Sequence, residues 1–123
     1  AAKILLVDDE PDLVKVTTHR LKKMGSHVLT GVTGQDALDL LRSEEPDLVL
    51  LDLRLPVIDG LDVCRKVKAD EKLKDIPIIF FTASTNSIAE NVKEVGADGC
   101  LIKPFNPEQL AAVLKKFLGK GKE

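Results

Sequence analysis

The sequence has few aromatic residues, no long apolar run and almost no net charge. Four phenylalanines and no tryptophan or tyrosine weigh against a stacking platform for single-stranded nucleic acid. No apolar run approaches the roughly 20 residues that cross a bilayer, and no apolar leader with a small-residue cleavage site is recognisable. A formal net charge of -2 gives no overall field that would hold DNA or an anionic membrane. We therefore expect no direct nucleic-acid or membrane partner.

Cysteine is equally scarce. Cys64 and Cys100 are too few and too far apart in the sequence for a metal knuckle or a redox CxxC pair. We predict two buried, reduced thiols and a cytoplasmic location. The length of 123 residues fits one compact domain with a real core. We expect this domain to occupy residues 1–123, with residues 119–123 as a flexible tail or the start of a linker.

What the sequence does contain is a regular alternation of strand-like and helix-like segments. Apolar runs predict strands near residues 3–7, 27–31, 47–51, 78–81 and 98–102. The continuous apolar character of the first run is typical of a parallel strand that is covered on both faces. Such β-α units with short connections predict a doubly wound α/β fold, in which right-handed crossovers place helices on both faces of a parallel sheet.

The helix-like segment after the first strand has the clearest boundaries. Pro11 suits the first helical turn, acidic Glu10 and Asp12 suit its positive end, and Gly25 suits the other end. The residues predicted to form its buried face recur every three or four positions, at Leu13, Thr17, Leu21 and Met24. An amphipathic helix is therefore expected to pack on the sheet here.

Four of the predicted strands end at a residue that can handle a cation or a phosphate. The first run ends at Asp8 and Asp9, the third at Asp52, the fourth at Thr82 and the fifth at Lys103. In open parallel α/β sheets, ligands bind at the carboxyl ends of the strands. The sequence therefore predicts three carboxylates, a hydroxyl and an ammonium group at one edge of one sheet.

Three neighbouring carboxylates favour a bound cation. Two carboxylates about 5 Å apart repel each other by roughly 3 kcal/mol at an effective dielectric near 20. Oxygen ligands with room for water suit Mg²⁺ better than Ca²⁺. An Asp carboxylate facing that cation could act as a nucleophile and form an acyl phosphate. Each residue alone also has a plainer interpretation, as a helix cap or a solvated loop side chain, but their joint placement favours a phosphoryl site.

These motifs resemble the receiver domain of two-component response regulators, of the chemotaxis-regulator type, over essentially the whole chain. Residues 4–11 look like the family's acidic motif and residues 47–60 like its phosphoacceptor motif. Residues 81–83 match the hydroxyl strand, and residues 96–105 match the lysine motif. The resemblance implies a flavodoxin-like fold with a five-stranded parallel sheet of order 2-1-3-4-5.

The resemblance also implies which residues perform the phosphoryl chemistry. Asp52 would be the phosphoacceptor. Lys103 would pair with the phosphoryl oxygens, and the hydroxyl of Thr82 would donate a hydrogen bond to one of them. We expect no enzymatic activity beyond the domain's own phosphorylation and dephosphorylation.

A Mg²⁺ site is implied by the same resemblance. Asp9, Asp52 and the backbone carbonyl of Arg54 would bind the ion directly, and Asp8 would bind it through water. Arg54 would also flank the path of the hydrolytic water. Two interpretations of its side chain stay open: it is solvated and the residue contributes only its carbonyl, or it reaches across the site and changes the lifetime of the acyl phosphate.

The implied function is a switch in a two-component system. A sensor histidine kinase or a phosphotransfer protein would donate the phosphoryl group. The new charge would draw Thr82 and the following loop inward and shift a pre-existing conformational equilibrium. The receiving partner would be a downstream protein or an output domain missing from this sequence.

One position departs from the family pattern. The family usually has a Tyr or Phe three residues before the lysine, where this sequence has Cys100. A thiol cannot copy a large ring that moves between exposed and buried positions. We therefore predict that activation moves the loop after Thr82 with less change at the fifth strand.

Three other classes stay open. The chain could be an interaction module that keeps the site without using it, although intact Asp52, Thr82 and Lys103 argue against that. An aspartyl phosphatase of the same architecture usually has a second acid where this chain has Arg54. A flavin-binding domain would need Gly, Ser and Thr in the loop after the first strand, which is acidic here.

Overall fold

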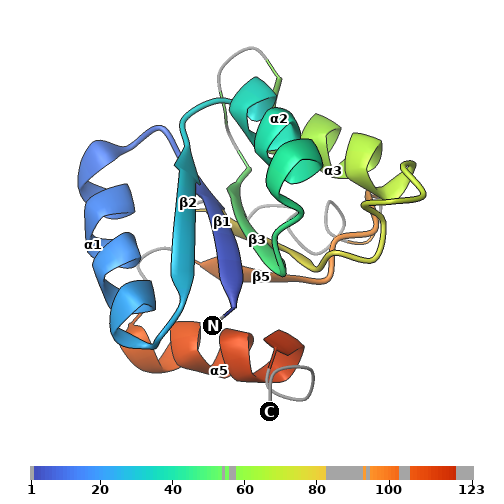
Figure 1. Ribbon diagram of the computed structural model, residues 1–123. Coiled ribbons are helices and arrows are strands. Elements are labelled where there is room, and N and C mark those ends of the chain that lie inside the picture. Colours follow the sequence, from blue (N-terminus) through green and yellow to red (C-terminus); the bar gives the residue numbers. More distant parts are fainter. Residues whose placement is uncertain are drawn as a thin grey trace.

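The computed structural model describes residues 2–53, 55, 58–82, 93, 95–102 and 106–118. Within them, strands form one parallel sheet with helices on both sides (Figure 1). The strands are β1 (Lys3–Val7), β2 (His27–Gly31), β3 (Leu48–Asp52), β4 (Ile78–Thr82) and β5 (Gly99–Ile102). The helices are α1 (Pro11–Lys23), α2 (Gly34–Glu44), α3 (Gly60–Lys68) and α5 (Pro107–Leu118). The predicted α/β class is confirmed.

The sheet runs in the order β2-β1-β3-β4-β5, and all of its neighbouring strands are parallel. This confirms the flavodoxin-like order that the resemblance implied. β1 lies between β2 and β3, with Val7 paired to Leu51 at its carboxyl end. The strand order reverses between β1 and β3, which is where such folds bind their ligands.

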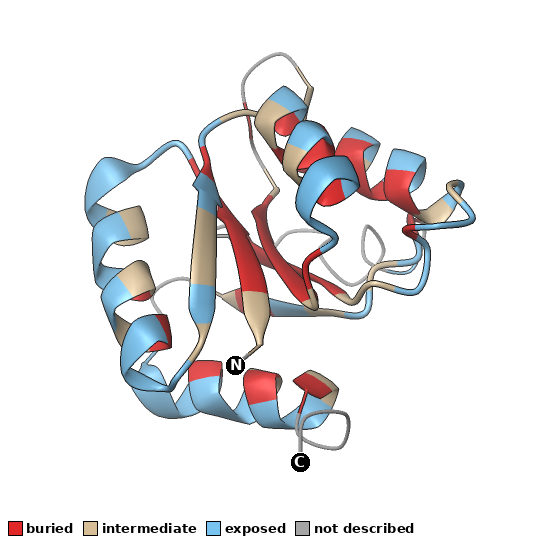
Figure 2. Cartoon of the chain, in the orientation of Figure 1, coloured by how far each residue is buried: buried red, intermediate tan, exposed pale blue. Residues whose placement is uncertain are grey.

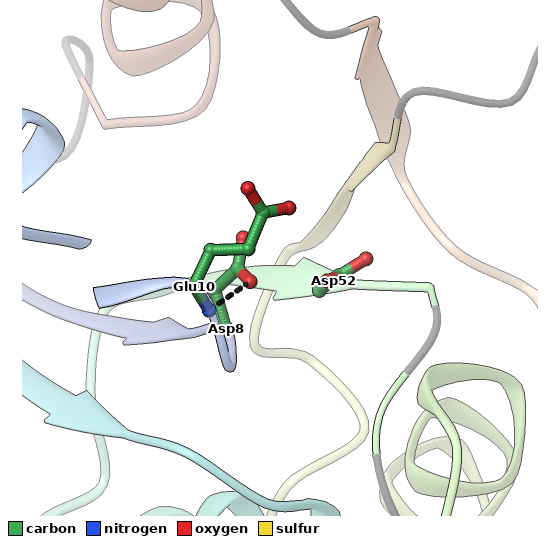
Figure 3. Close-up of side chains that lie close together, drawn as sticks. All are labelled: Asp8, Glu10 and Asp52. Carbon is green, nitrogen blue, oxygen red and sulfur yellow. Dashed lines mark hydrogen bonds between the residues drawn. The ribbon is translucent and has the colours of Figure 1, made fainter. Parts of the chain in front are cut away.

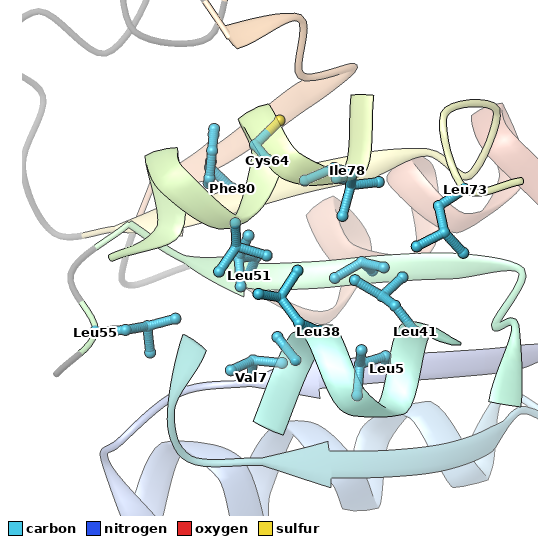
Figure 4. Packing of buried hydrophobic residues seen from close by; sticks show 14 of the residues in the cluster. Leu5, Val7, Leu38, Leu41, Leu51, Leu55, Cys64, Leu73, Ile78 and Phe80 are labelled. Atoms are coloured by element: carbon cyan, nitrogen blue, oxygen red, sulfur yellow. The ribbon is translucent and has the colours of Figure 1, made fainter. Parts of the chain in front are cut away.

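The sheet separates two hydrophobic clusters. The first, which we call the α2/α3 core, includes Leu5 and Val7 of β1 and lies under α2 and α3 (Figure 4). The second, the α1/α5 core, includes Ile4 and Leu6 and lies under α1 and α5. Side chains alternate between the faces of a strand, so one fully apolar strand supplies both cores. Figure 2 shows the result, with buried central strands and helices exposed on their outer faces.

The start of α2 is fixed by a capping box. The side chain of Thr33 accepts a hydrogen bond from the Asp36 backbone N–H at 3.1 Å, and Asp36 accepts from the Thr33 N–H at 3.2 Å. Asp36 also accepts from the Val32 N–H at 2.9 Å. These backbone donors, first that of Val32 and then that of Thr33, lower the pKa of the Asp36 carboxyl. The box satisfies donors that the first helical turn would otherwise leave unpaired.

Two predictions of burial were wrong. Met24 is 38% exposed, whereas Thr17 and Leu21 are buried as predicted. Met24 is the C-cap of α1, one residue past its last helical residue, so it no longer follows the buried face. Cys64 is buried but Cys100 is exposed. β5 is an edge strand, and the alternation that buries Leu101 in the α1/α5 core turns Cys100 to the opposite face.

Residues 83–92 and 94 lie outside the described residues, whereas Val95 is buried in the α2/α3 core. Within the part of the chain that the structure describes, no helix is long and apolar enough to cross a membrane.

Candidate functional site

Asp8 and Asp52 stand side by side at the carboxyl edge of the sheet. Asp52 is the last residue of β3, and Asp8 follows directly on β1. The backbone N–H of Asp8 donates to the Gly31 carbonyl at 3.2 Å, which continues the pairing of β1 with β2 by one residue. The two carboxylates are 1% and 5% exposed, respectively. The sequence prediction that these two acids meet is therefore confirmed.

The third carboxylate of the group is that of Glu10. Asp8, Glu10 and Asp52 each offer an oxygen atom, and these three atoms all lie within 4.8 Å of one another (Figure 3). The backbone N–H of Glu10 donates to Oδ1 of Asp8 at 2.9 Å, so the turn after β1 is closed by Asp8 itself. Glu10 is the N-cap of α1, and its side chain makes no capping hydrogen bond. Its carboxylate is turned toward the other two acids instead of the helix.

Asp9 occupies a different position. It is exposed, and it is not one of the three residues whose oxygens gather. With Asp8 it lines an open pocket of ≈ 290 Å³ between the start of α1 and the end of β2. Sequence reasoning named Asp9 and treated Glu10 only as a favourable charge for the helix. A third acid directly after the pair was the available signal.

The remaining predicted site residues are only partly described. Arg54 and Lys103 lie outside the described residues, as does the side chain of Thr82. The backbone still places the ends of their strands. Phe81 pairs with Asp52 across β3 and β4, and Thr82 pairs with Ile102, the residue before Lys103. The ends of β3, β4 and β5 therefore lie in register at the same edge of the sheet.

The donor set of the cluster fits a hard divalent cation. All three ligating groups are carboxylates, and two of them are almost fully buried. Buried like charges at this separation are costly without a counter-ion or proton uptake. Mg²⁺ typically binds through one or two protein carboxylates and keeps several waters, so a cluster open on one side suits it. The residues present therefore fit Mg²⁺.

A parallel sheet of order 2-1-3-4-5 with an acidic cluster at the β1/β3 switch point defines a flavodoxin-like domain whose ligand-binding edge carries carboxylates. Residues 4–115 match the family model described as the response regulator receiver domain. The chain belongs to that family. In two-component signalling, the general role of this family is that of a phosphoacceptor, and its members act as switch domains rather than enzymes.

Solved structures agree with this assignment. The chemotaxis response regulator CheY4 of Vibrio cholerae is 34% identical, with a TM-score of 0.88 over 95% of this chain and 98% of that chain. The receiver domain of the sensor histidine kinase PA1611 from Pseudomonas aeruginosa PAO1 is 33% identical, with a TM-score of 0.88 over 97% of this chain and 98% of that one. That receiver domain was solved with a magnesium ion coordinated in its active-site cleft.

A curated relative is considerably longer. The probable transcriptional regulator ycf27 of Guillardia theta is 39% identical over 118 residues, which cover 94% of this chain and 45% of that protein. The chain therefore spans a little under half the length of this relative.

Proposed function

We propose that Asp52 is the phosphoacceptor of this receiver domain and that its phosphorylation requires Mg²⁺. The observation that carries the proposal is the meeting of the Asp8, Glu10 and Asp52 carboxylates within 4.8 Å at the end of β3. Asp52 ends the central strand β3, so its carboxylate can face a donor that approaches the carboxyl edge of the sheet. A donor that reached any other side of the molecule would meet no comparable group of acids among the described residues.

The transfer would exchange one phosphorus bond for another. A carboxylate oxygen of Asp52 would bond to the phosphorus atom as the bond from phosphorus to the donor's histidine nitrogen breaks, and the nitrogen would keep the electron pair. Lys103 and Thr82 would bind the phosphoryl oxygens. Water would later cleave the acyl phosphate, returning the carboxylate and releasing inorganic phosphate.

Mg²⁺ would offset the carboxylate charges and screen the incoming phosphoryl group. Asp8 and Asp52 are the buried pair that would hold the ion, directly or through water. The family pattern adds Asp9 and the carbonyl of Arg54, and the geometry adds Glu10. The magnesium ion of the PA1611 receiver domain supports this part of the proposal by analogy.

Partners follow from the same chemistry. The donor would be a sensor histidine kinase or a phosphotransfer protein, and the receiving partner a downstream protein or an attached domain. Residues 1–123 would form one receiver domain, either independent or part of a longer regulator or kinase. The similar proteins include a longer transcriptional regulator and the receiver domain of a sensor histidine kinase. Both cysteines are free, which suits a reducing compartment and a cytoplasmic location.

The experiment is intact mass spectrometry after incubation with acetyl phosphate, in Mg²⁺ and in EDTA, on the parent protein and on Asp52→Asn. We expect one added phosphoryl group on the parent in Mg²⁺ only, and none on Asp52→Asn. Asp75→Asn, an exposed acid in the turn after α3, serves as the matched control and should behave as the parent.

A parent protein that takes no phosphoryl group would next be tested for a stable beryllofluoride complex. Formation of that complex would preserve the proposal and indicate a very short-lived acyl phosphate. Failure of both reactions would overturn the proposal in favour of an interaction module that does not use its site.

A further inference from the structure

Two glycines lie against the backbone near the two ends of the connection between β3 and α3, at Leu53 and at Ile58. This segment runs from residue 53 to residue 59, directly after Asp52. Gly60, the first residue of α3, lies against its beginning. A Cβ atom at Gly60 would overlap the carbonyl oxygen of Asp52 and stand 3.0 Å from the Cα of Leu53. The Gly60 N–H also donates to the Leu53 carbonyl at 3.0 Å. α3 therefore begins in direct contact with the backbone that leaves the phosphoacceptor.

Gly34, the first residue of α2, lies against the other end of the segment. A Cβ atom at this position would overlap the carbonyl oxygen of Ile58, 2.8 Å from the Cβ and 3.0 Å from the carbonyl carbon of the same residue. The obstacle is backbone, so rotation of a side chain could not make room. Any side chain at position 34 must move either α2 or Ile58.

Of α2 and Ile58, α2 is held more firmly in place. Its first turn is closed by the reciprocal hydrogen bonds of Thr33 and Asp36. Its inner face is locked into the α2/α3 core by Ala37, Leu38 and Leu41. A new side chain at position 34 would therefore displace Ile58 rather than α2, because Ile58 is only partly buried against that core.

We propose that Gly34 is a positioning residue for the phosphoryl site. The absence of a side chain at Gly34 lets the backbone of Ile58 lie against the start of α2. Ile58 leads within two residues to Gly60, which contacts the Asp52 carbonyl and donates to that of Leu53, so this contact bears on where the backbone after Asp52 stands. The inference rests on the proposed function, in which this segment supplies the Arg54 carbonyl to Mg²⁺. It places a determinant of the site on a helix that contributes no ligand.

The test is Gly34→Ala, with Gly99→Ala as the matched control. A Cβ atom at Gly99 meets only side-chain atoms, the nearest being Cδ1 of Ile79 at 3.2 Å, and Gly99 begins β5 at the edge of the sheet opposite the site. Since the protein has no tryptophan or tyrosine, Mg²⁺ binding is followed by calorimetry and by amide NMR shifts. Groups that orient metal ligands from outside change affinity by roughly 10- to 100-fold, so we expect Gly34→Ala to bind Mg²⁺ about tenfold more weakly.

Further measurements separate positioning from loss of structure. In EDTA, the amide shifts that Gly34→Ala changes are expected at the substituted residue and its neighbours in α2 and, away from these, to concentrate on residues 52–60, while the amides of β5 and α5 stay as in the parent. If Gly34→Ala does not fold, Ile58→Ala is the second variant: it keeps the backbone atoms that meet Gly34 but removes the side-chain atoms that pack Ile58 against the α2/α3 core. It loosens the same stretch of backbone without adding atoms, and it too is expected to weaken Mg²⁺ binding.

The outcomes distinguish the two proposals. A parent that binds Mg²⁺ and takes the phosphoryl group, together with Gly34→Ala and Ile58→Ala variants of unchanged Mg²⁺ affinity, would overturn the inference and leave the proposed function standing. A parent that binds no Mg²⁺ would overturn both.

Discussion

Lys68 and Asp98, 30 residues apart in the sequence, form an ion pair of 3.0 Å at the amino edge of the sheet. The Lys68 ammonium also donates to the backbone carbonyls of Lys74 and Ile76, at 3.0 Å and 3.1 Å. Asp98 accepts from the Ile78 N–H at 2.9 Å. One cation thus ties the end of α3 to the turn before β4 and to the residue before β5, at the edge of the sheet opposite the carboxylate cluster.

Replacing Lys68 with Met is expected to destabilise the fold without touching the phosphoryl chemistry. The substitution keeps the aliphatic stem but leaves the two carbonyls and Asp98 without this donor, at a cost of about 1 to 2 kcal/mol. Urea unfolding measures the loss, and Lys66→Met on the exposed side of α3 is the control. A Lys68→Met protein as stable as Lys66→Met would show that solvent replaces these bonds without cost.

Asp52→Asn is expected to stabilise the protein when no metal is present. Removing one charge from the group formed with Asp8 and Glu10 relieves repulsion between carboxylates within 4.8 Å. We expect a gain of about 1 kcal/mol in the free energy of unfolding in EDTA. In saturating Mg²⁺ the parent should instead be the more stable of the two proteins, because it gains more free energy from binding the ion than Asp52→Asn does. A variant less stable than the parent in EDTA would mean that the Asp52 carboxylate is held by favourable contacts that outweigh the repulsion.

Asp36 is expected to contribute stability that depends on pH. The hydrogen bonds from the Val32 and Thr33 N–H groups lower its pKa in the folded protein. This contribution is therefore fully present above the unfolded value of 3.8 and is lost as pH falls through the lower folded value. Asp36→Asn should cost about 1 kcal/mol at neutral pH and less in acid. Asp39→Asn on the same helix is the control. If the free energies of unfolding of the parent and of Asp36→Asn, measured by urea unfolding, changed in parallel with pH, the contribution assigned to Asp36 would be refuted.

The two thiols are expected to differ in reactivity. Burial raises the pKa of Cys64 to about 11, and its Sγ donates to the Val95 carbonyl at 3.4 Å. Cys100 is exposed. Because the thiolate is the reactive form, iodoacetamide at mildly alkaline pH should add one group to the folded protein and none to Cys100→Ser. Rapid double alkylation of the native protein would contradict the buried position of Cys64.

The apolar runs predicted the strands and the α/β class, and the family resemblance added the sheet order, which brings Asp8 beside Asp52. Sequence reasoning did not place Glu10 in the carboxylate cluster, since which acid of a turn faces the other acids depends on hydrogen bonds such as that from the Glu10 N–H to Asp8. Sequence reasoning also wrongly predicted that Cys100 is buried, because periodicity alone does not say which face of an edge strand is covered.

The contact of Gly34 with Ile58 was equally beyond sequence reasoning. It joins two residues from different helix starts, and nothing in the pattern of either segment records that their backbones touch. Such close approaches depend on how α2 and α3 sit on the same face of the sheet, which only the packed structure defines.

The two hydrophobic cores share a single wall. Every central strand contributes to both, with Leu5 and Val7 on one face of β1 and Ile4 and Leu6 on the other. Removing either layer of helices would expose strands on which the other layer also packs. The domain should therefore unfold in one cooperative transition rather than in two. The carboxylates at the ends of β1 and β3 are therefore mounted on strands that both layers of helices hold in place.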